Sequence, residues 1–177
     1  MVLLKKISWI IKTLFGIVFY GKIGFLTYIG SPNYIIGRSK LYIGNRVRIL
    51  YNFRCEIHNN GEVRIGDSTS IGHNCHISSC ELLAIGANVT ISSNVFLGSL
   101  DHTFEIPNTH VMNQPLSCIQ TTVGDFSFIG TGAVILAGTN IGKNCVVGAN
   151  SVVNGNFPDY SIIAGYPAKN IGFRKEI

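Results

Sequence analysis

Hydrophobic positions in the last third of the chain recur every six residues. The large aliphatic side chains are those of Val123, Ile129, Ile135, Ile141, Val147 and Val153. Glycine directly follows four of them, and the residue four places on is small in each complete unit. A period of six fits neither an α-helix, at about 3.6 residues per turn, nor a plain strand, at 2. It is typical of a solenoid whose short strands turn a corner every six residues.

Each six-residue unit is expected to bury one aliphatic side chain in a narrow interior and then to bend. We expect the following glycine to supply the positive φ of the corner. The small residue four places on avoids crowding where successive turns stack. One unit cannot bury its side chain alone, so stability must come from stacking, with three units closing a triangular coil of about 18 residues.

The same period runs earlier in the chain, over residues 43–55, 65–83 and 85–97, with breaks in phase between these runs. The first two breaks are short and predict bulges or small loops. A third break spans residues 98–122 and contains His102 and His110. A long structureless insertion in a compact domain is usually functional or disordered.

Residues 1–30 follow a different pattern, in which lysines interrupt long apolar stretches. A membrane-spanning helix needs about 20 largely uncharged residues, and Lys12 and Lys22 cut the stretch short. There is no convincing cleavage site for a signal peptide. The pattern favours one or two amphipathic helices in a membrane interface, anchored by Trp9, Phe15 and Phe19. A helix that caps the open end of the solenoid explains it equally well.

These patterns divide the 177-residue chain into three parts. Residues 1–30 are an apolar and basic helical segment, residues 31–155 are a β-helix domain with the inserted loop 98–122, and residues 156–177 are a C-terminal tail. The length is that of one modest domain. A composition of 46% hydrophobic and 13% charged residues suits a solenoid core.

Charge is distributed unevenly along the chain. Residues 1–64 hold ten Lys/Arg and two Asp/Glu, a net +8, whereas residues 65–177 hold four and seven, a net −3, which together give the total of +5. A basic N-terminal part suits an anionic membrane face or an anionic, lipid-linked substrate. Without a helix-turn-helix, zinc-finger or RNA-binding signature, nucleic acid is not an expected partner. The expected location is the cytoplasm, either free or peripheral on the inner face of the membrane.

The cysteines are odd in number and form no C-x-x-C pair. They are Cys55, Cys75, Cys80, Cys118 and Cys145. Cys55 and Cys145 stand at repeat positions where a small apolar residue would serve. We therefore expect free buried thiols in a reducing cytosol rather than a disulfide framework or a zinc site.

The hexad run 129–141, the segment Val147-Gly148-Ala149-Asn150-Ser151 and the terminus Gly165-Tyr166-Pro167-Ala168-Lys169 together resemble the hexapeptide-repeat acyltransferases. The resemblance covers roughly residues 35–172 and is nearest to the sugar O-acetyltransferases of surface-polysaccharide and lipopolysaccharide biosynthesis. It implies an all-β fold, a left-handed parallel β-helix, assembled as a homotrimer. It also implies acetyl-CoA in a groove between neighbouring subunits, direct transfer without an acyl-enzyme, and no required metal.

The implied reaction is attack of a sugar hydroxyl on the acetyl-CoA thioester. Because that hydroxyl is a poor nucleophile at neutral pH, a base must take its proton, and histidine suits the task. The family places its catalytic histidine at the mouth of the inserted loop, which here reads Phe96-Leu97-Gly98-Ser99-Leu100-Asp101-His102. His102 is therefore the predicted base.

An acidic side chain often orients such a histidine. Asp101 can do so only through a turn, because adjacent side chains of an extended chain point to opposite faces. Glu105 lies three residues on and could fold back. Glu81 lies about one coil earlier and could approach from a neighbouring turn. The choice among the three stays open at this point, and a backbone carbonyl is a fourth alternative.

For the acceptor sugar, alignment with galactoside acetyltransferases indicates His73 and Glu81. Phe128 keeps an aromatic wall where the family often has tryptophan, and the loss of the indole N–H bears on acceptor choice. His110 lies deeper in the inserted loop, where it could touch the substrate or be simply solvated.

For acetyl-CoA, the family pattern maps onto Gly130, Thr131, Ala149 and Lys169. Glycine and alanine let the pantetheine arm lie close to the backbone, and the lysine could meet a CoA phosphate. The alternative for Thr131 and Ala149 is ordinary corner packing. Asn154-Gly155 stands where the family often has Thr-Lys, which puts one cationic contact in doubt.

We predict an acetyl-CoA-dependent O-acetyltransferase acting on a sugar of a surface polysaccharide or of its lipid-linked or nucleotide-linked precursor. One alternative is N-acetyl transfer to an amino sugar. A second is a metalloenzyme like the γ-carbonic anhydrases, with zinc held by histidines such as His73, His76, His102 and His110. A third is a solenoid that only scaffolds partners.

Overall fold

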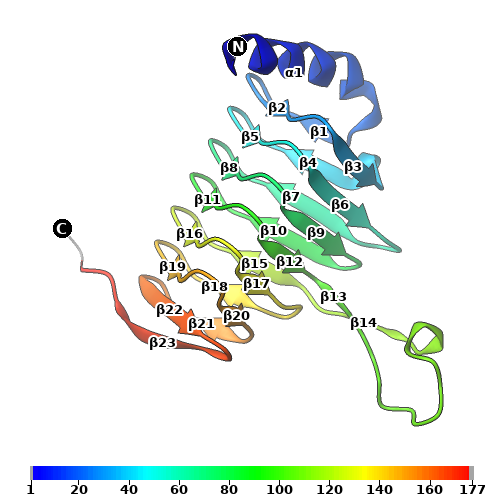
Figure 1. The fold of residues 1–177 in the computed structure, drawn as a ribbon, viewed down its shortest axis with the longest axis vertical. Coiled ribbons are helices and arrows are strands. Elements are labelled where there is room, and N and C mark those ends of the chain that lie inside the picture. The colour runs from blue at the N-terminus through cyan, green and yellow to red at the C-terminus, as the bar shows by residue number, and fades with distance from the viewer. Residues whose placement is uncertain (1, 176–177) are drawn as a thin grey trace.

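The protein is a seven-turn coil of short parallel strands with one helix across its end (Figure 1). The computed structural model describes residues 2–175, and for residues 2, 3 and 14–17 only the backbone. The chain begins with α1 (Val2–Gly16) and a 3-10 turn, η1 (Ile17–Phe19). A second 3-10 turn, η2 (Arg38–Lys40), lies between strands of the coil. The parallel β-helix and N-terminal helix predicted from the sequence are confirmed.

The coil has three faces, each a parallel sheet built from one strand per turn. The first face contains β1 (Lys22–Ile23), β4 (Leu41–Ile43), β7 (Glu62–Ile65), β10 (Leu82–Ile85), β15 (Thr121–Val123), β18 (Asn140–Ile141) and β21 (Asn156–Phe157). The second contains β2 (Tyr28–Ile29), β5 (Arg48–Ile49), β8 (Ser70–Ile71), β11 (Thr90–Ile91), β16 (Phe128–Ile129), β19 (Val146–Val147) and β22 (Ser161–Gly165), with β23 (Ala168–Phe173) antiparallel at its edge. The third contains β3 (Asn33–Ile36), β6 (Phe53–Ile57), β9 (His76–Ser79), β12 (Phe96–Gly98), β17 (Val134–Ile135) and β20 (Val152–Val153).

The hexad aliphatic residues line the interior of this prism. All six residues of the last run, from Val123 to Val153, are at most 2% exposed. Ile129 pairs with Val147, 18 residues on, as a three-sided coil requires. Each such burial contributes about 1.5–3 kcal/mol, so the stacked turns hold one another together.

The glycine that follows each aliphatic residue has a different role from the one expected. Positive φ occurs instead three places after the aliphatic residue, at Phe126, Gly132, Gly138, Asn144 and Asn150. Gly124 lies where one turn passes closest to the next, and a Cβ there would come within 2.5 Å of the Gly142 carbonyl carbon. The glycine is required by this close approach between turns.

The small residue four places on links consecutive turns as well as avoiding crowding. The Ser127 hydroxyl donates to the Gly142 carbonyl at 3.0 Å and accepts from the Cys145 N–H at 3.1 Å. Thr69 makes the same two bonds two turns earlier, to Gly86 and Val89. These hydroxyls satisfy backbone groups that the corners leave without ladder partners.

The phase breaks gather at one corner, between the third and first faces. In a regular turn, paired residues are 18 apart in sequence. The separation is 22 between Ile49 and Ile71, and 20 between Ile71 and Ile91. It is 38 between Ile91 and Ile129. The extra residues lie at 58–61, 80–81 and 99–120, the segments that join third-face to first-face strands. Every insertion therefore projects from the same edge of the prism.

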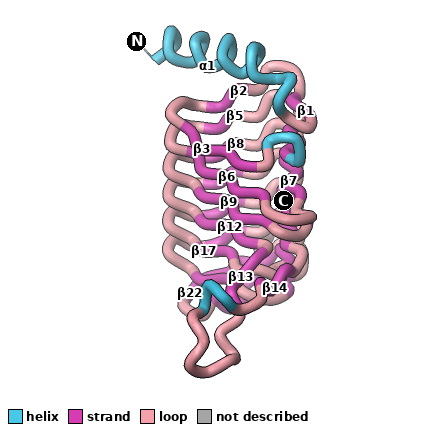
Figure 2. Tube along the Cα trace, turned by 90° about the vertical axis from the view of Figure 1, so that its right-hand side faces the viewer, coloured by secondary structure: helices cyan, strands magenta, loops and turns pink. Residues whose placement is uncertain are grey.

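The longest insertion is an ordered hairpin, in contrast to the structureless loop expected. It contains the antiparallel pair β13 (Leu100–His102) and β14 (Leu116–Cys118), with a 3-10 turn, η3 (Val111–Asn113), near its tip. The Gln114 side chain bonds the backbone of Ile106 and Thr109 and holds the tip together. Figure 2 shows the hairpin projecting beyond the stacked turns.

A disulfide between Cys80 and Cys118 anchors this hairpin to the coil. The expectation of five free thiols is therefore wrong for these two residues. They lie 38 residues apart in sequence, and only the return of β14 to the corner before β10 brings them together. Cys55, Cys75 and Cys145 are free and buried, as expected. Burial raises the pKa of the Cys55 thiol to about 12.

Helix α1 caps the open end of the coil. Trp9 contacts the ring of Tyr28, with ring centres 5.9 Å apart, and the Thr13 hydroxyl accepts from the Ile29 N–H at 3.1 Å. The side chain of Phe15, one of the expected anchors, lies outside the described residues. Within residues 2–175 no helix is both long and apolar enough to cross a membrane.

The segment boundaries differ from those expected. Strands β1 and β2 already belong to the first turn, so the helical part ends near residue 19 rather than 30. Strands β21 and β22 complete the last turn, so the coil continues past residue 155 to about 165. The turn and strand that follow, with the Gly165-Tyr166-Pro167-Ala168-Lys169 motif, fold back along β22.

Candidate active site

His102 ends the first strand of the hairpin, where β13 pairs with β14 opposite Leu116. Its side chain is partly buried. The ring Nδ1 atom is buried and has no hydrogen-bond partner among residues 2–175. A buried ring nitrogen without a partner is costly, so this atom calls for an explanation.

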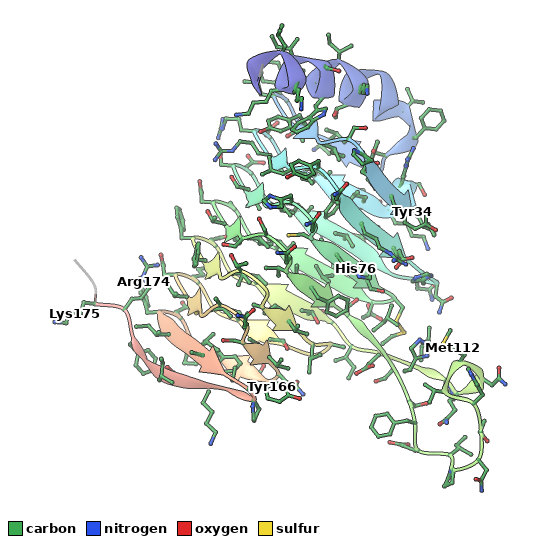
Figure 3. All side chains as sticks on the ribbon, viewed as in Figure 1. Tyr34, His76, Met112, Tyr166, Arg174 and Lys175 are labelled. Carbon is green, nitrogen blue, oxygen red and sulfur yellow. A yellow bond between two sulfur atoms is a disulfide. The ribbon has the colours of Figure 1, made fainter. Side chains whose placement is uncertain are left out.

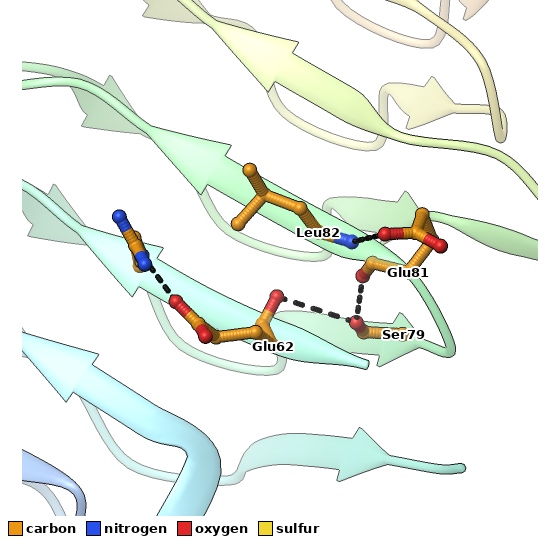
Figure 4. Close-up of polar contacts among 5 residues, drawn as sticks. Glu62, Ser79, Glu81 and Leu82 are labelled. Atoms are coloured by element: carbon orange, nitrogen blue, oxygen red, sulfur yellow. Dashed lines mark hydrogen bonds and ion pairs between the residues drawn. The ribbon is translucent and has the colours of Figure 1, made fainter. Parts of the chain in front are cut away.

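None of the three expected acids bonds Nδ1 of His102. The Asp101 carboxylate accepts instead from the His102 backbone N–H, at 2.8 Å. Glu105 is exposed on the hairpin. Glu81 sits at the corner below, where Oε1 accepts from the Leu82 N–H at 3.2 Å and its carbonyl accepts from Ser79 (Figure 4). Among the described residues, no acid orients the ring through Nδ1.

His110 has a local structural role. Its Nδ1 accepts from the Met112 N–H at 3.2 Å and caps the 3-10 turn η3. The residue is exposed near the tip of the hairpin, where Figure 3 labels Met112. A capping bond of this kind orders the tip, and it leaves His110 away from the coil.

The third face carries a second imidazole–carboxylate pair that the sequence pattern did not reveal. Nε2 of His76 lies 3.0 Å from Glu56 Oε2, and the same carboxylate pairs with Arg54 at 2.8 Å. The Phe96 ring contacts His76 edge-on, with ring centres 5.3 Å apart. Arg54, and to a smaller extent His76, hold the pKa of the Glu56 carboxyl below its usual value against the opposing effect of burial.

These residues meet because the strand register places them side by side. Arg54 pairs with His76, and His76 pairs with Phe96, on neighbouring strands. His76 and Glu56 are 20 residues apart in sequence. His76 is therefore a paired histidine on an outer face of the coil, a setting that its place in the sequence did not predict.

His73 lies at the corner between the second and third faces. Its ring stacks on Tyr51, with ring centres 5.1 Å apart, and its Nδ1 lies 3.1 Å from the Ser93 hydroxyl. Glu81, its expected partner in holding the acceptor, lies at the other corner, between the third and first faces. The two residues are therefore not brought together within one chain.

The expected coenzyme residues do gather, at the C-terminal end of the second face. Gly130 and Ala149 stack directly, since a Cβ on Gly130 would come within 2.6 Å of the Ala149 nitrogen. The Asn150 N–H donates to the Thr131 carbonyl at 2.9 Å. Phe128 is exposed on β16, and Lys169 is exposed on β23 opposite Ala164. We name residues 128–131, 148–150 and 169 the coenzyme corner.

The hairpin and the coenzyme corner lie at opposite edges of the third face. The hairpin begins after Gly98, whereas the coenzyme corner precedes β17 and β20. A strand of about five residues separates the two edges, which is roughly 17 Å. His102 and Thr131 of one chain are therefore on different edges of the prism.

The arrangement of side chains in the described part of one chain does not indicate a metal site. Within the described part of the chain, no group of three His, Cys, Asp or Glu side chains is placed to hold a metal ion. His73, His76, His102 and His110 each occupy a different setting, at a corner, on a face, at a strand end and near a hairpin tip.

The coil, its projecting histidine hairpin and the glycine-lined corner define a transferase of the hexapeptide-repeat class. The family described as "Bacterial transferase hexapeptide (six repeats)" matches residues 120–155, and "Hexapeptide repeat of succinyl-transferase" matches residues 62–99. WbbJ of Escherichia coli (strain K12), named as a lipopolysaccharide biosynthesis O-acetyl transferase, is 32% identical over 147 residues, which are 79% of this chain and 75% of the relative. The chain belongs to this acyltransferase family.

Other relatives show the range of the fold. Galactoside O-acetyltransferase of the same strain is 32% identical over 111 residues, and the match spans 62% of this chain but about half, 53%, of that enzyme. The solved structure of a galactoside acetyltransferase with coenzyme A has a TM-score of 0.62 at 26% identity, over 92% of this chain and 68% of that one. AntD, an N-acyltransferase of Bacillus cereus solved with dTDP and coenzyme A, has a TM-score of 0.82 at 22% identity, over 93% and 89% of the two chains.

Proposed function

We propose that this protein transfers acetyl from acetyl-CoA to a hydroxyl of a sugar in a surface polysaccharide or in its lipid-linked or nucleotide-linked precursor. The observation that carries the proposal is the partly buried His102 at the base of the hairpin, whose Nδ1 has no hydrogen-bond partner within residues 2–175. The likeness to WbbJ and to galactoside O-acetyltransferase supports an oxygen acceptor.

His102 acts as the general base in this scheme. The imidazole takes the proton from the sugar hydroxyl while the hydroxyl oxygen attacks the thioester carbonyl. When the tetrahedral intermediate collapses, the carbon–sulfur bond breaks and the imidazolium returns the proton to the CoA thiolate. Transfer is direct, so no acyl group is held by the protein.

The site is completed between neighbouring protomers of a homotrimer. Two observations support this arrangement: Nδ1 of His102 has no partner in the described part of its own chain, and the coenzyme corner lies at the opposite edge of the third face. In a cyclic trimer, one edge of each prism meets the opposite edge of the next. That packing sets His102 of one protomer beside Thr131 and Ala149 of its neighbour.

One observation favours a second candidate, N-acetyl transfer to an amino sugar. AntD, whose fold superposes over 93% of this chain, is an N-acyltransferase solved with dTDP. The paired His76 and Glu56 offer another base, on the face between the two edges. An amine acceptor would need the same thioester cleft with a different sugar pocket.

The experiment compares surface glycan from cells that express the wild-type protein or one of three variants. Mass spectrometry counts acetyl groups before and after mild alkali, which removes esters and leaves amides. We expect alkali-labile acetyl in wild type and its loss in His102→Ala, with turnover in vitro reduced about 10²- to 10⁴-fold. His110→Ala, which removes only a capping bond, should retain acetylation.

Three results would contradict this assignment. Acetyl groups that resist alkali would be amides, which would mean that the acceptor is an amine and not a hydroxyl. Normal acetylation in His102→Ala together with loss in His76→Ala would transfer the role of base to the pair on the third face. If neither variant changed the glycan and no CoA thiol were released, the protein would be a solenoid without catalytic activity.

A further inference from the structure

The outer side of helix α1 carries an exposed apolar stripe. Leu4, Ile7 and Ile11 are 71%, 44% and 48% exposed. At about 100° per residue they fall within roughly 60° of one another around the helix. Trp9 and Thr13, on the other side, hold the helix to the first turn of the coil. The stripe therefore lies on the side of α1 that faces away from the coil.

The chain that follows the helix extends this apolar surface. The exposed residues are Val18, Phe19, Phe25 and Leu26. Leu26 has a φ of 54° at a corner position that the next turns fill with Arg46, Ser68 and Asn88. Left-handed backbone is unfavourable for leucine, and exposure of its side chain to water gains nothing. Contact of this corner with an apolar phase would account both for leucine at this left-handed position and for the exposure of its side chain.

Positive charge lies directly beside the stripe. A hollow of about 600 Å³ opens between α1 and the first two turns, lined by Lys5, Lys6, Lys12, Trp9, Pro32 and Tyr51. None of the ion pairs formed within residues 2–175 includes these lysines. The first 55 residues contain nine Lys/Arg and no Asp/Glu. The hollow is thus an uncompensated cationic site at the margin of an apolar surface.

We propose that this end of the coil docks on a bilayer of anionic phospholipids. The stripe of α1 lies in the boundary between headgroups and acyl chains, and the lysine hollow surrounds a lipid phosphate. An apolar face flanked by lysines is the pattern of helices that lie in this boundary. Charge complementarity selects the anionic bilayer as occupant, since lysines near its surface each strengthen binding. Docking is independent of the transfer reaction.

The test is sedimentation of the full chain with extruded vesicles. One set contains phosphatidylglycerol and phosphatidylethanolamine, and the other contains phosphatidylcholine only. We expect binding to the anionic set at least about tenfold stronger, weakened by 0.5 M salt. Replacing Lys5, Lys6 and Lys12 together by glutamine should reduce partition into anionic vesicles about 100-fold.

The matched control removes three charges at the other end of the chain, by replacing Lys143, Arg174 and Lys175 with glutamine. It should change partition less than about threefold. A second variant, with Leu4→Ser, Ile7→Ser and Ile11→Ser, should also lose vesicle binding. Its helix content and unfolding midpoint should match wild type, because these side chains point outward.

Four results would overturn the inference. They are equal binding to both vesicle sets, an equal loss in the control variant, and lysine-dependent binding of inorganic phosphate without vesicle binding. The fourth is self-association through this end, seen by ultracentrifugation as a doubled mass that the serine variant abolishes, again without vesicle binding. Acetyl transfer to a soluble acceptor would survive each of them, so the two proposals fail separately.

Discussion

Backbone geometry restricts the residue type at two positions of each six-residue unit, and the two positions favour different residues. The position directly after the aliphatic residue meets the next turn at close range, as Gly124 does with Gly142. The position three places on takes a positive φ, which asparagine accepts at Asn144 and Asn150. Small size and left-handed backbone are separate demands: Gly124 meets the first, and Gly132 and Gly138 meet the second.

Replacing Gly124 by alanine should destabilise the coil. The new methyl group would stand 2.5 Å from the Gly142 carbonyl carbon, which no side-chain movement relieves. We expect a loss of about 1–3 kcal/mol in the free energy of unfolding, as for other overpacked interiors. Urea unfolding at fixed protein concentration measures it.

Gly172→Ala is the matched control for this prediction. No atom lies within 4 Å of a Cβ built at Gly172. Its effect should stay within about 0.5 kcal/mol, as for most surface substitutions. Equal effects at the two positions would show that the glycine after the aliphatic residue is not required by close approach.

The elements of the third face combine by register into a row of outward side chains. Strands β6, β9 and β12 bring Arg54, His76 and Phe96 alongside one another, and Glu56 reaches both Arg54 and His76. Such cross-strand neighbours stabilise a sheet. This row ends where the hairpin begins, so its stability bears on the placement of His102.

This row makes stability depend on acid pH. The pKa of the Glu56 carboxyl is lowered chiefly by Arg54, and then by His76, from an ordinary value of 4.5. A lowered folded pKa adds stability that is present above about pH 4.5 and is lost as pH falls through the folded value. The unfolding midpoint of wild type should therefore fall more steeply below pH 4.5 than that of Glu56→Gln.

Glu105→Gln serves as the control, because Glu105 is an exposed carboxylate on the hairpin. This variant should follow the wild-type curve between pH 5.5 and pH 3.5. Parallel curves for wild type and Glu56→Gln, measured by thermal unfolding across that range, would mean that the ion pair adds no pH-dependent stability.

In the whole molecule, the features discussed above lie at different edges and ends of the prism. Insertions gather at one edge, the coenzyme corner occupies another, and the helix closes one end. A straight coil cannot bring its own edges together, because the filled interior lies between them. A reaction that needs His102 and the coenzyme corner therefore depends on assembly.

Mixed assemblies test this directly. His102→Ala and Ala149→Tyr should each be inactive alone, the first without its base and the second with a ring filling the exposed coenzyme corner. Co-expression in equal amounts should restore about one quarter of the wild-type sites if each site joins two protomers, from random mixing in a cyclic trimer. CoA release by the purified mixture measures this fraction, and its absence would place each site within one chain.

The period of the repeat, the buried positions and the family were readable from the sequence, because they depend on residues a fixed distance apart. Val123 to Val153 fall inside because six residues make one side of the coil, whatever lies above or below. The candidate coenzyme residues and His102 came from the family resemblance, and the coenzyme candidates do lie together. The role of His102 stays a prediction.

Tertiary structure decided the contacts whose spacing depends on the insertions. The turns are 16, 18, 20, 22 or 38 residues long, so residues that touch across turns have no constant separation. Cys80 meets Cys118, and His76 meets Glu56, for this reason alone. Local periodicity fixes which side chains point inward, and only the stacked coil fixes which outward side chains become neighbours.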